Sequence, residues 1–374
     1  MSPFNRFKRL RKTAAVLLSR QALRPCARTN WVRRAREAVE LLKEKRLTLL
    51  SSSGMTTWEM LTALASIYKI PVNMYLICSS NEDFYRQQAF LIEQFDLDEN
   101  NTDFTPVLIT DDGNLKEDKM TARDKHIIED ADLLIPVSIK KDGNMARLLK
   151  QNGGKEIMRD FEITYEKRQS PLTYKIDPAR LSADIVSLND KYLFHWTRTF
   201  NTAWPGERLI DFYRDILSRP VYPRSAFETL KRILTDKKIA ASGRHMPGGE
   251  KTVSFSASSP VELLPLMKWR ARYRQMSFEP YGLGIRRETA LARGVRPVRY
   301  YEKKLPAEIE KDKRWLCQSA GRISDWRREK EYRWRGDFFF DDIPSDDIIA
   351  VCLNKNEARA LENTTGLKTI SFTE

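Results

Sequence analysis

Near its carboxyl end the chain reads Trp326-Arg-Arg-Glu-Lys-Glu-Tyr-Arg-Trp-Arg-Gly-Asp337, with one residue between Glu329 and Glu331. The large and charged residues that alternate from Glu331 onward are typical of a strand, which predicts both carboxylates on one face of an extended segment. Such a carboxylate can stabilise positive charge that develops on a substrate. The same run also fits a solvated series of ion pairs, because basic residues flank both acids.

Two earlier segments have a similar alternating character, Phe-His195-Trp-Thr197 and Val-Ser254-Phe-Ser256. Alternation puts His195 and Thr197 on one face of their strand, where a neutral imidazole and a hydroxyl can together bind the cis-diol of a ribose. Ser254 and Ser256 likewise share a face. Each pair also has a plainer interpretation: a histidine satisfied within the core, and two hydroxyls at a sheet edge.

The order His-x-Thr, Ser-x-Ser and Glu-x-Glu resembles the NAD-cleaving core of the ADP-ribosyltransferases, over residues 192–372. Short strands with interspersed helices predict an α+β domain with a split, largely antiparallel sheet in this half. The resemblance implies that NAD is the co-substrate. It further implies that Glu331 drives the loss of nicotinamide and that Glu329 helps to deprotonate an acceptor.

The same resemblance implies binding roles for five other residues. His195 and Thr197 would hold the ribose of NAD, and Ser254 and Ser256 would shape the nicotinamide-ribose pocket. Tyr281 is our candidate for the aromatic ring that stacks on nicotinamide.

The chain mixes two signatures of this group. His-type transferases generally lack a Glu-x-Glu pair, and Glu-x-Glu enzymes usually open with Arg rather than His, so the acceptor is left open. Residues 280–285 and 294–300 also resemble bacterial abortive-infection proteins. A helix is expected from Val261 to Tyr273, ending in the basic segment 268–274. The interleaved aromatic and basic residues of this segment suit either nucleic-acid binding or a helix face packed on the core.

The amino-terminal half alternates strands with helices, which predicts an α/β domain with a parallel sheet. It resembles Rossmann-like nucleotide-sensing modules related to DNA-processing proteins and to nucleoside-processing enzymes. The loop Ser51–Gly54, behind the first predicted strand, is a candidate nucleotide or phosphate site at a helix N-terminus. The strands are expected at residues 47–51, 72–78, 104–109 and 133–138.

Charge and composition bound the rest of the interpretation. The net charge is +14, and residues 1–36 hold eleven Lys or Arg and no acid. This arm is expected to bind an anion such as nucleic acid, to lie as a solvated basic helix, or to act as a transit peptide. The domains are then residues 1–36 (basic arm), 37–150 (Rossmann-like), 151–190 (connector) and 191–374 (transferase-like).

No apolar run approaches the roughly 18 residues of a membrane span. The four cysteines have no paired spacing, so no metal site is predicted and a cytoplasmic location is expected.

These features favour an NAD-dependent ADP-ribosyltransferase, an antiphage or toxin effector that modifies a nucleic acid or a protein and has a partner protein or antitoxin. The alternatives are an NAD glycohydrolase, a non-catalytic nucleic-acid-binding protein, and chemistry in the amino-terminal domain with Asp124 or Asp132 as the carboxylate.

Overall fold

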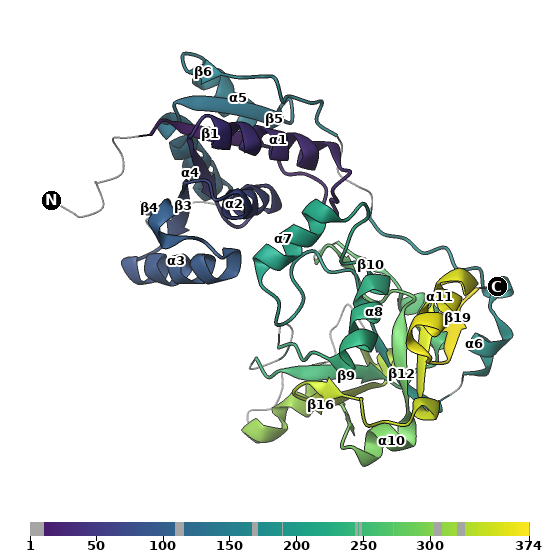
Figure 1. Cartoon of the computed structure of the whole chain (residues 1–374). Helices are drawn as coiled ribbons and strands as arrows, with labels where there is room; N and C mark the ends of the chain where they lie inside the picture. Colours follow the sequence, from purple (N-terminus) through teal and green to yellow (C-terminus); the bar gives the residue numbers. More distant parts are fainter. Residues whose placement is uncertain are drawn as a thin grey trace. The chain divides into compact units, whose positions relative to one another are not determined.

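The structure is a computed structural model that describes residues 11–108, 116–166, 171–188, 190–243, 246, 249–271, 273–302, 309–319 and 326–373. Contacts divide the chain into two compact units (Figure 1). The first unit comprises Met1–Gln169 and Glu207–Pro223, and the second comprises Ser170–Gly206 and Arg224–Glu374. Each unit has its own core and is described separately.

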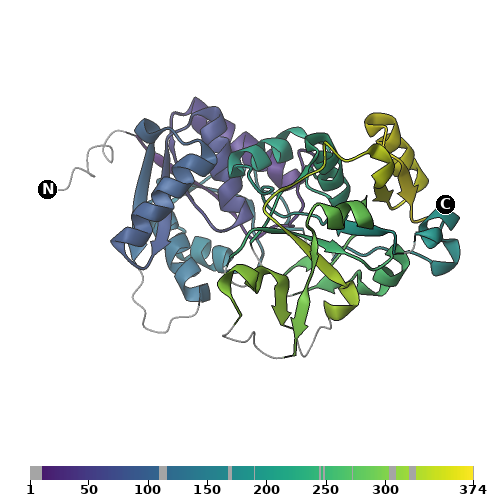
Figure 2. The same cartoon turned by 90° about the horizontal axis from the view of Figure 1, so that it is seen from below.

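The first unit contains a six-stranded, fully parallel sheet in the order β4-β3-β2-β1-β5-β6. Its helices lie around the strands (Figures 1 and 2), so both faces of the sheet are covered and the strands are largely apolar. The parallel α/β domain expected for this half is therefore confirmed. The strands are β1 (Thr13–Leu18), β2 (Thr48–Ser52), β3 (Val72–Cys78), β4 (Thr102–Leu108), β5 (Leu133–Ser138) and β6 (Glu156–Ile157). The helices are α1 (Asn30–Glu44), α2 (Thr56–Tyr68), α3 (Asn81–Phe95), α4 (Lys116–Asp130) and α5 (Asn144–Gln151).

Strand β1 corrects the prediction of a basic arm over residues 1–36. It pairs with β2 on one side and β5 on the other, and residues 14–18 are at most 1% exposed. Five apolar residues between two basic stretches are enough for a buried strand, because the charges lie beyond its ends. The boundary expected at residue 37 is thus too late, and the one at 150 too early, since β6 also joins this sheet. Residues 1–10 lie outside the described part of the chain.

Helix α7 (Leu209–Ser218) also belongs to the first unit, although the sequence places it in the carboxyl-terminal domain. One face of the helix is buried, and the Tyr213 ring stacks on Phe95 at 6.0 Å between centroids. The Tyr213 hydroxyl donates a 2.7 Å hydrogen bond to Glu59 of α2. Burial of this apolar face explains why the segment folds with the first unit.

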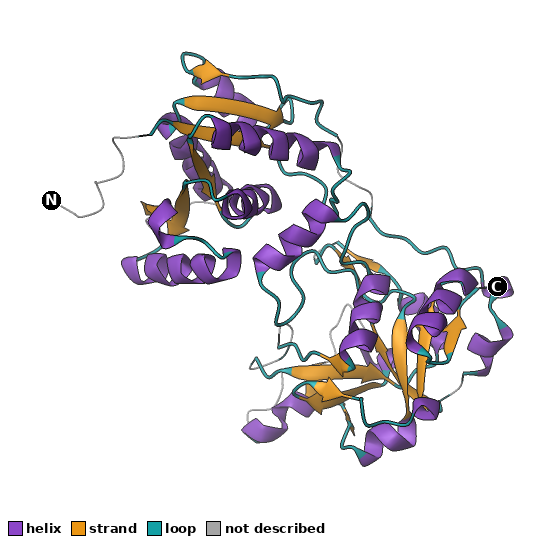
Figure 3. Ribbon diagram, in the orientation of Figure 1, coloured by secondary structure: helices purple, strands orange, loops and turns teal. Residues whose placement is uncertain are grey.

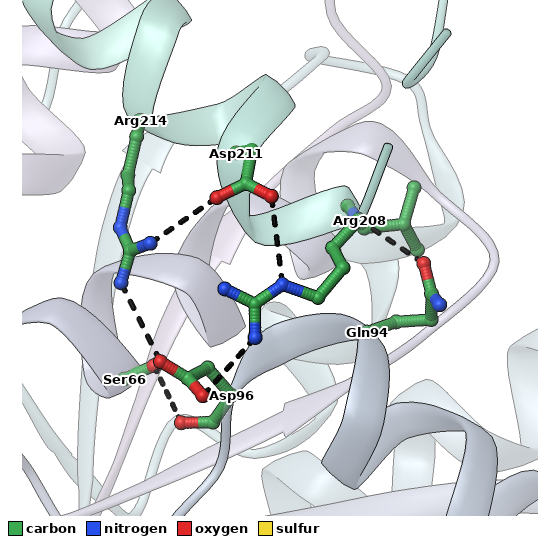
Figure 4. A network of polar contacts seen from close by, with 7 residues as sticks. Ser66, Gln94, Asp96, Arg208, Asp211 and Arg214 are labelled. Atoms are coloured by element: carbon green, nitrogen blue, oxygen red, sulfur yellow. Dashed lines mark hydrogen bonds and ion pairs between the residues drawn. The ribbon is translucent and has the colours of Figure 1, made fainter. Parts of the chain in front are cut away.

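A network of charges fixes the exposed side of α7 (Figure 4). Arg208 and Arg214 each contact Asp211 and also reach Asp96, which follows the end of α3. The backbone N–H of Leu209 donates to the side-chain oxygen of Gln94. These ion pairs are about half exposed, so each contributes less than the apolar face does.

The second unit is built on a seven-stranded sheet in the order β13-β16-β9-β7-β12-β18-β19. Figure 3 shows its strands in orange, with helices packed beside them. Every pairing in it is antiparallel except that between β18 and β19, and α11 packs on these two strands. The expected α+β architecture with a largely antiparallel sheet is confirmed at that level. The strands are β7 (Tyr192–Trp196), β9 (Thr252–Ser256), β12 (Gly282–Arg286), β13 (Arg296–Pro297), β16 (Glu331–Arg335), β18 (Ile348–Cys352) and β19 (Thr369–Ser371). The longer helices are α8 (Ala226–Asp236) and α11 (Lys355–Thr365).

This sheet opens between β7 and β9, which pair through one residue pair, Phe194 with Ser256, among the described residues. By contrast, β7 pairs with β12 through five residues, and β9 pairs with β16 through five. The two halves of the sheet therefore separate after Phe194, and Ser254 of β9 pairs with Arg333 of β16 but, among the described residues, with no residue of β7.

The helix expected from Val261 to Tyr273 is much shorter than predicted. Helix α9 covers Pro260–Leu263, and a capping box of Ser259 and Glu262 stabilises its N-terminus. A 3-10 turn follows at Leu264–Leu266, where Pro265 has no N–H to continue the helix. The basic segment then forms an antiparallel hairpin of β10 (Trp269–Arg270) and β11 (Gln275–Met276).

Candidate functional site

A cavity of about 650 Å³ lies in the second unit, at the place where the sheet opens. Its size is in the range of small-ligand sites. Strands β7, β9 and β16 all contribute residues to its wall. Six of the seven side chains predicted from the sequence line it: His195, Thr197, Ser254, Ser256, Glu329 and Glu331.

Glu331 begins β16 and is held by two neighbours. The register of β16 on β9 puts Glu331 opposite Ser256 and Arg333 opposite Ser254. The Ser254 hydroxyl donates a 2.7 Å hydrogen bond to Glu331 Oε1. Arg333 Nε donates to Oε1 at 2.8 Å and Nη2 donates to Oε2 at 3.0 Å. This charge-assisted, bidentate contact fixes the carboxylate in one orientation.

Glu329 was predicted to share a strand face with Glu331, but the structure places it outside the strand. It ends a 3-10 turn (Trp326–Glu329), and Lys330 adopts a left-handed conformation with φ of 47° before β16 begins. The extended segment therefore starts only at Glu331. Burial and, to a smaller extent, the negative charge of Glu331 together raise the pKa of Glu329 to about 8. Arg270 is the main group that opposes this rise.

His195 is held by the backbone of Ser254, which pairs with β16 on one side and, among the described residues, is not paired with β7 on the other. Its Nδ1 lies 2.9 Å from the Ser254 carbonyl oxygen, so Nδ1 carries the proton and Nε2 is an acceptor. Burial lowers the pKa of His195 to about 4, which keeps the imidazole neutral near pH 7. A neutral acceptor nitrogen on the cavity wall is suited to a ligand hydroxyl.

Two of the predicted hydroxyls are already bound to the protein backbone. Thr197 is 2% exposed, and its hydroxyl donates to the carbonyls of Ala226 and Tyr281 at 2.8 and 3.1 Å. The Ser256 hydroxyl donates to the Glu329 carbonyl at 2.6 Å. Thr197 thus anchors the end of β7, and Ser256 fixes the turn that carries Glu329, whereas both were expected to face a ligand.

Tyr281 corrects the prediction of a nicotinamide-stacking ring. It is outside the cavity lining, packs against Phe227 and Tyr174, and donates its hydroxyl to Glu357 at 3.1 Å. Its position directly before β12 directs it into the core. Aromatic side chains that line the cavity and are not fully buried are Phe200, Trp204, Tyr273 and Phe278.

Cations outnumber acids on the cavity wall. Trp204 contributes an aromatic surface beside them, with the guanidinium of Arg232 4.6 Å from its ring centroid. Such a wall favours an anionic ligand. The basic residues are Arg198, Arg232, Lys238, Arg270 and Arg333, and the acidic ones are Asp236, Glu329 and Glu331.

The predicted nucleotide loop of the first unit uses its polar groups internally. The Ser51 hydroxyl bonds the Trp58 carbonyl and the Thr62 hydroxyl, and the Ser52 hydroxyl donates to the Tyr75 carbonyl. The N–H of Gly54 donates to Glu59. These groups already have protein partners, and the binding of a nucleotide at Ser51–Gly54 stays a prediction.

The two alternative carboxylates of this unit are also engaged. Asp124 pairs with the buried Arg123 at 2.7 Å, and burial raises the pKa of Asp124. Asp132 accepts hydrogen bonds from the backbone and hydroxyl of Thr13. Both therefore have structural partners within the sheet unit.

Several cavity residues were missed from the sequence. Arg333 could have been found, because alternation along a strand places it on the same face as Glu331. Arg198 follows the His-x-Thr segment directly. Trp204 and Arg232 carry no comparable signal, since only the folded chain brings their segments beside β7 and β9.

This chain has little similarity to known proteins. No family model and no curated protein matches this chain. Among solved structures, DNA processing protein A from Streptococcus pneumoniae is similar at 16% identity with a TM-score of 0.29. That match covers 39% of this chain and 49% of the other, so the chain spans about half of its length. Within the described ranges, every helix is too short or too polar to cross a membrane.

Proposed function

We propose that the second unit is an NAD-dependent ADP-ribosyltransferase. The observation that carries the proposal is the cluster of Ser254, Glu331 and His195 on the wall of one basic cavity. A fixed carboxylate, a neutral imidazole and an excess of cations match three parts of NAD. These are the ribose that gains positive charge, its hydroxyls, and the pyrophosphate.

In this proposal Glu331 acts on the bond between ribose C1 and the nicotinamide nitrogen. As that bond breaks, its electron pair leaves with nicotinamide and positive charge develops on the ribose. A hydrogen bond from the ribose 2′-hydroxyl to the Glu331 carboxylate strengthens as this charge grows. His195 Nε2 would accept from a second ribose hydroxyl and so hold the sugar in place.

Glu329 is the proposed base for the acceptor. The acceptor nucleophile bonds to ribose C1, and its proton passes to the ionised Glu329 carboxylate. A pKa of about 8 leaves a fraction of this side chain ionised at pH 7 and lets it hold the proton afterwards.

A nucleic acid is the acceptor that the surroundings favour. Arg270 and Tyr273 of the β10–β11 hairpin line the cavity, and Tyr273 is 45% exposed. Cations interleaved with aromatic rings neutralise phosphates and stack on bases. We further propose that the protein is a cytoplasmic antiphage or toxin effector, restrained by a partner protein or antitoxin, whose first unit senses a nucleotide.

The test uses purified full-length protein and NAD labelled in its adenylate part, with DNA, RNA or cell lysate added. Glu331→Gln is compared with Glu250→Gln, a matched control that removes an ion pair with Arg335 outside the cavity. Transfer of label to nucleic acid by the wild type and the control alone supports the proposal.

Other outcomes identify the alternatives. Transfer of label to protein would mean that the acceptor is a protein and not a nucleic acid. Free ADP-ribose without transfer would indicate an NAD glycohydrolase. Binding of nucleic acid without NAD turnover, unchanged in Glu331→Gln and steeply weakened by salt, would indicate a non-catalytic binding protein.

A further inference from the structure

Arg333 is a buried arginine whose guanidinium is bonded on every side. Its side chain is 3% exposed, on β16 two residues after Glu331. A guanidinium has five N–H groups, and each has an acceptor here. Besides the two bonds to Glu331, Nη2 donates to Gln318 Oε1 at 2.8 Å, and Nη1 donates to the carbonyls of Trp315 and Cys317 at 2.7 and 3.4 Å.

These bonds join Glu331 to a second part of the unit. Trp315 lies in a 3-10 turn (Lys311–Leu316), and Cys317 begins the short strand β15 (Cys317–Ser319). Arg333 thereby ties the carboxylate on β16 to the β15 region, which is remote from it in sequence. The Arg333 guanidinium therefore cannot rotate without breaking several of these hydrogen bonds.

The contacts also determine which acceptor positions of Glu331 remain. A carboxylate has about four lone-pair positions, two on each oxygen. Ser254 and Arg333 Nε occupy Oε1, and Arg333 Nη2 occupies one position on Oε2. The position left is on Oε2, and Glu331 lines the cavity.

We propose that Arg333 is a positioning residue, which directs the remaining lone pair of Glu331 Oε2 toward the substrate ribose. This inference rests on the proposed transferase function and adds a residue that acts through Glu331 rather than on NAD. A lysine can replace it only in part, because an ammonium group lacks the planar fork that holds both carboxylate oxygens at once.

The test compares Arg333→Lys and Arg333→Met with Arg335→Lys and Arg335→Met. Arg335 is two residues further along the same strand, pairs with Glu250, and lies outside the cavity lining. In Arg333→Met we expect kcat for nicotinamide release to fall roughly 100-fold while KM for NAD changes less than about 3-fold. Arg333→Lys should lose roughly 10-fold, and the Arg335 variants should retain kcat.

Two further measurements separate positioning from a merely structural role. The crystal structure of Arg333→Met should show Glu331 displaced from Ser254. Arg333 is also one of the cations that hold down the pKa of Glu329, so the pH at which acceptor transfer is half-maximal should rise in Arg333→Met. A purely structural role would lower the melting temperature and leave Glu331 in contact with Ser254, without a fall in kcat at nearly constant KM.

Two results would overturn the inference. One is a structure of Arg333→Met in which Glu331 keeps its contact with Ser254, and the other is a kcat loss matched by the Arg335 variants. If the wild type releases no nicotinamide, the proposed function fails. The positioning claim is then still decided by where Glu331 lies in the Arg333→Met structure.

Discussion

Two places in this molecule, the carboxyl end of β2 and the open side of β9, bring serines beside a glutamate, and we call them its two edges. At the end of β2, the hydroxyls of Ser51 and Ser52 and the N–H of Gly54 are all bound within the first unit. At the open edge of β9, Ser254 binds Glu331, and both line a cavity of about 650 Å³.

The difference lies in the strand partners rather than in the residue types. The first edge belongs to a continuous sheet, so its polar groups find acceptors on neighbouring strands and on α2. In the second unit the sheet opens after Phe194, and the contacts of Glu331 leave one acceptor position on Oε2 beside the cavity. Such polar residues indicate a ligand site when the fold leaves some of their hydrogen-bond donors or acceptors facing a cavity.

The largest expected effect is that of Glu331→Gln. Loss of the anionic charge should lower the rate of nicotinamide release roughly 100- to 1000-fold. The matched change at the first edge, Glu59→Gln, should leave this rate unchanged. A comparable loss in Glu59→Gln would contradict the contrast between the two edges.

Next in size is the effect of Glu329→Gln on the second half of the reaction. Transfer to the acceptor should fall roughly 100-fold, whereas nicotinamide release should fall less than about 10-fold. In the wild type, transfer should increase as pH rises through about 8, because the ionised carboxylate is the active form. A flat pH profile between 6 and 9 would remove Glu329 from the proposed mechanism; this range brackets its pKa of about 8.

Replacing a serine should affect kcat at one edge and the free energy of unfolding at the other. Ser254→Ala should reduce kcat about 10-fold, the equivalent of one hydrogen bond to a charged group. Ser52→Ala should leave kcat unchanged and lower the free energy of unfolding by about 1 to 3 kcal/mol, because the Tyr75 carbonyl loses its buried donor. Kinetics and denaturant unfolding of the two variants provide the check.

His195 should make the second unit less stable in acid. Its pKa in the folded state is about 4, below the unfolded value of 6.5, so its contribution is present above pH 6.5. That contribution is lost as pH falls from 6.5 through 4, because the unfolded chain takes up the proton first. Unfolding of His195→Asn, followed between these pH values, should show a weaker pH dependence than the wild type. An unchanged slope would mean that the imidazole is hydrated and not neutral.

The smallest expected effect concerns the exposed network on α7. Asp96→Asn removes contacts to Arg208 and Arg214 and should cost less than about 1 kcal/mol in unfolding free energy. Tyr213→Phe, which removes the bond to Glu59 on the buried side, should cost more. The reverse order would mean that the charges, and not the apolar face, hold α7 in the first unit.

Strands with uninterrupted apolar runs were predictable from the sequence. The segments predicted for β2, β3 and β5 agree with the structure to within a residue at each end. Strand β1 was not predicted, because its apolar run is short and lies between basic stretches, and a charge pattern does not reveal a sheet neighbour. The membership of α7 was equally hidden, since it depends on contacts with residues far away in sequence.

For the candidate site, residue types were easier to predict than their geometry. Alternation predicted Ser254 and Ser256 on one strand face, and both line the cavity, but it could not show the left-handed turn at Lys330 that takes Glu329 off the strand. Nor could it show that Tyr281 packs in the core. Alternation places Arg333 on the strand face of Glu331, but its burial could not be predicted, because a buried arginine and a solvated one have the same pattern in a run of charges.

Release of nicotinamide from NAD by the full-length protein tests the central claim most directly, because every proposed role of the cavity depends on that step. We would measure it with label in the nicotinamide ring, for the wild type, Glu331→Gln and Glu250→Gln, with and without nucleic acid. The account predicts release by the wild type and by Glu250→Gln, and a loss of roughly 100-fold or more in Glu331→Gln. Equal release by all three proteins, or none by any of them, would contradict it.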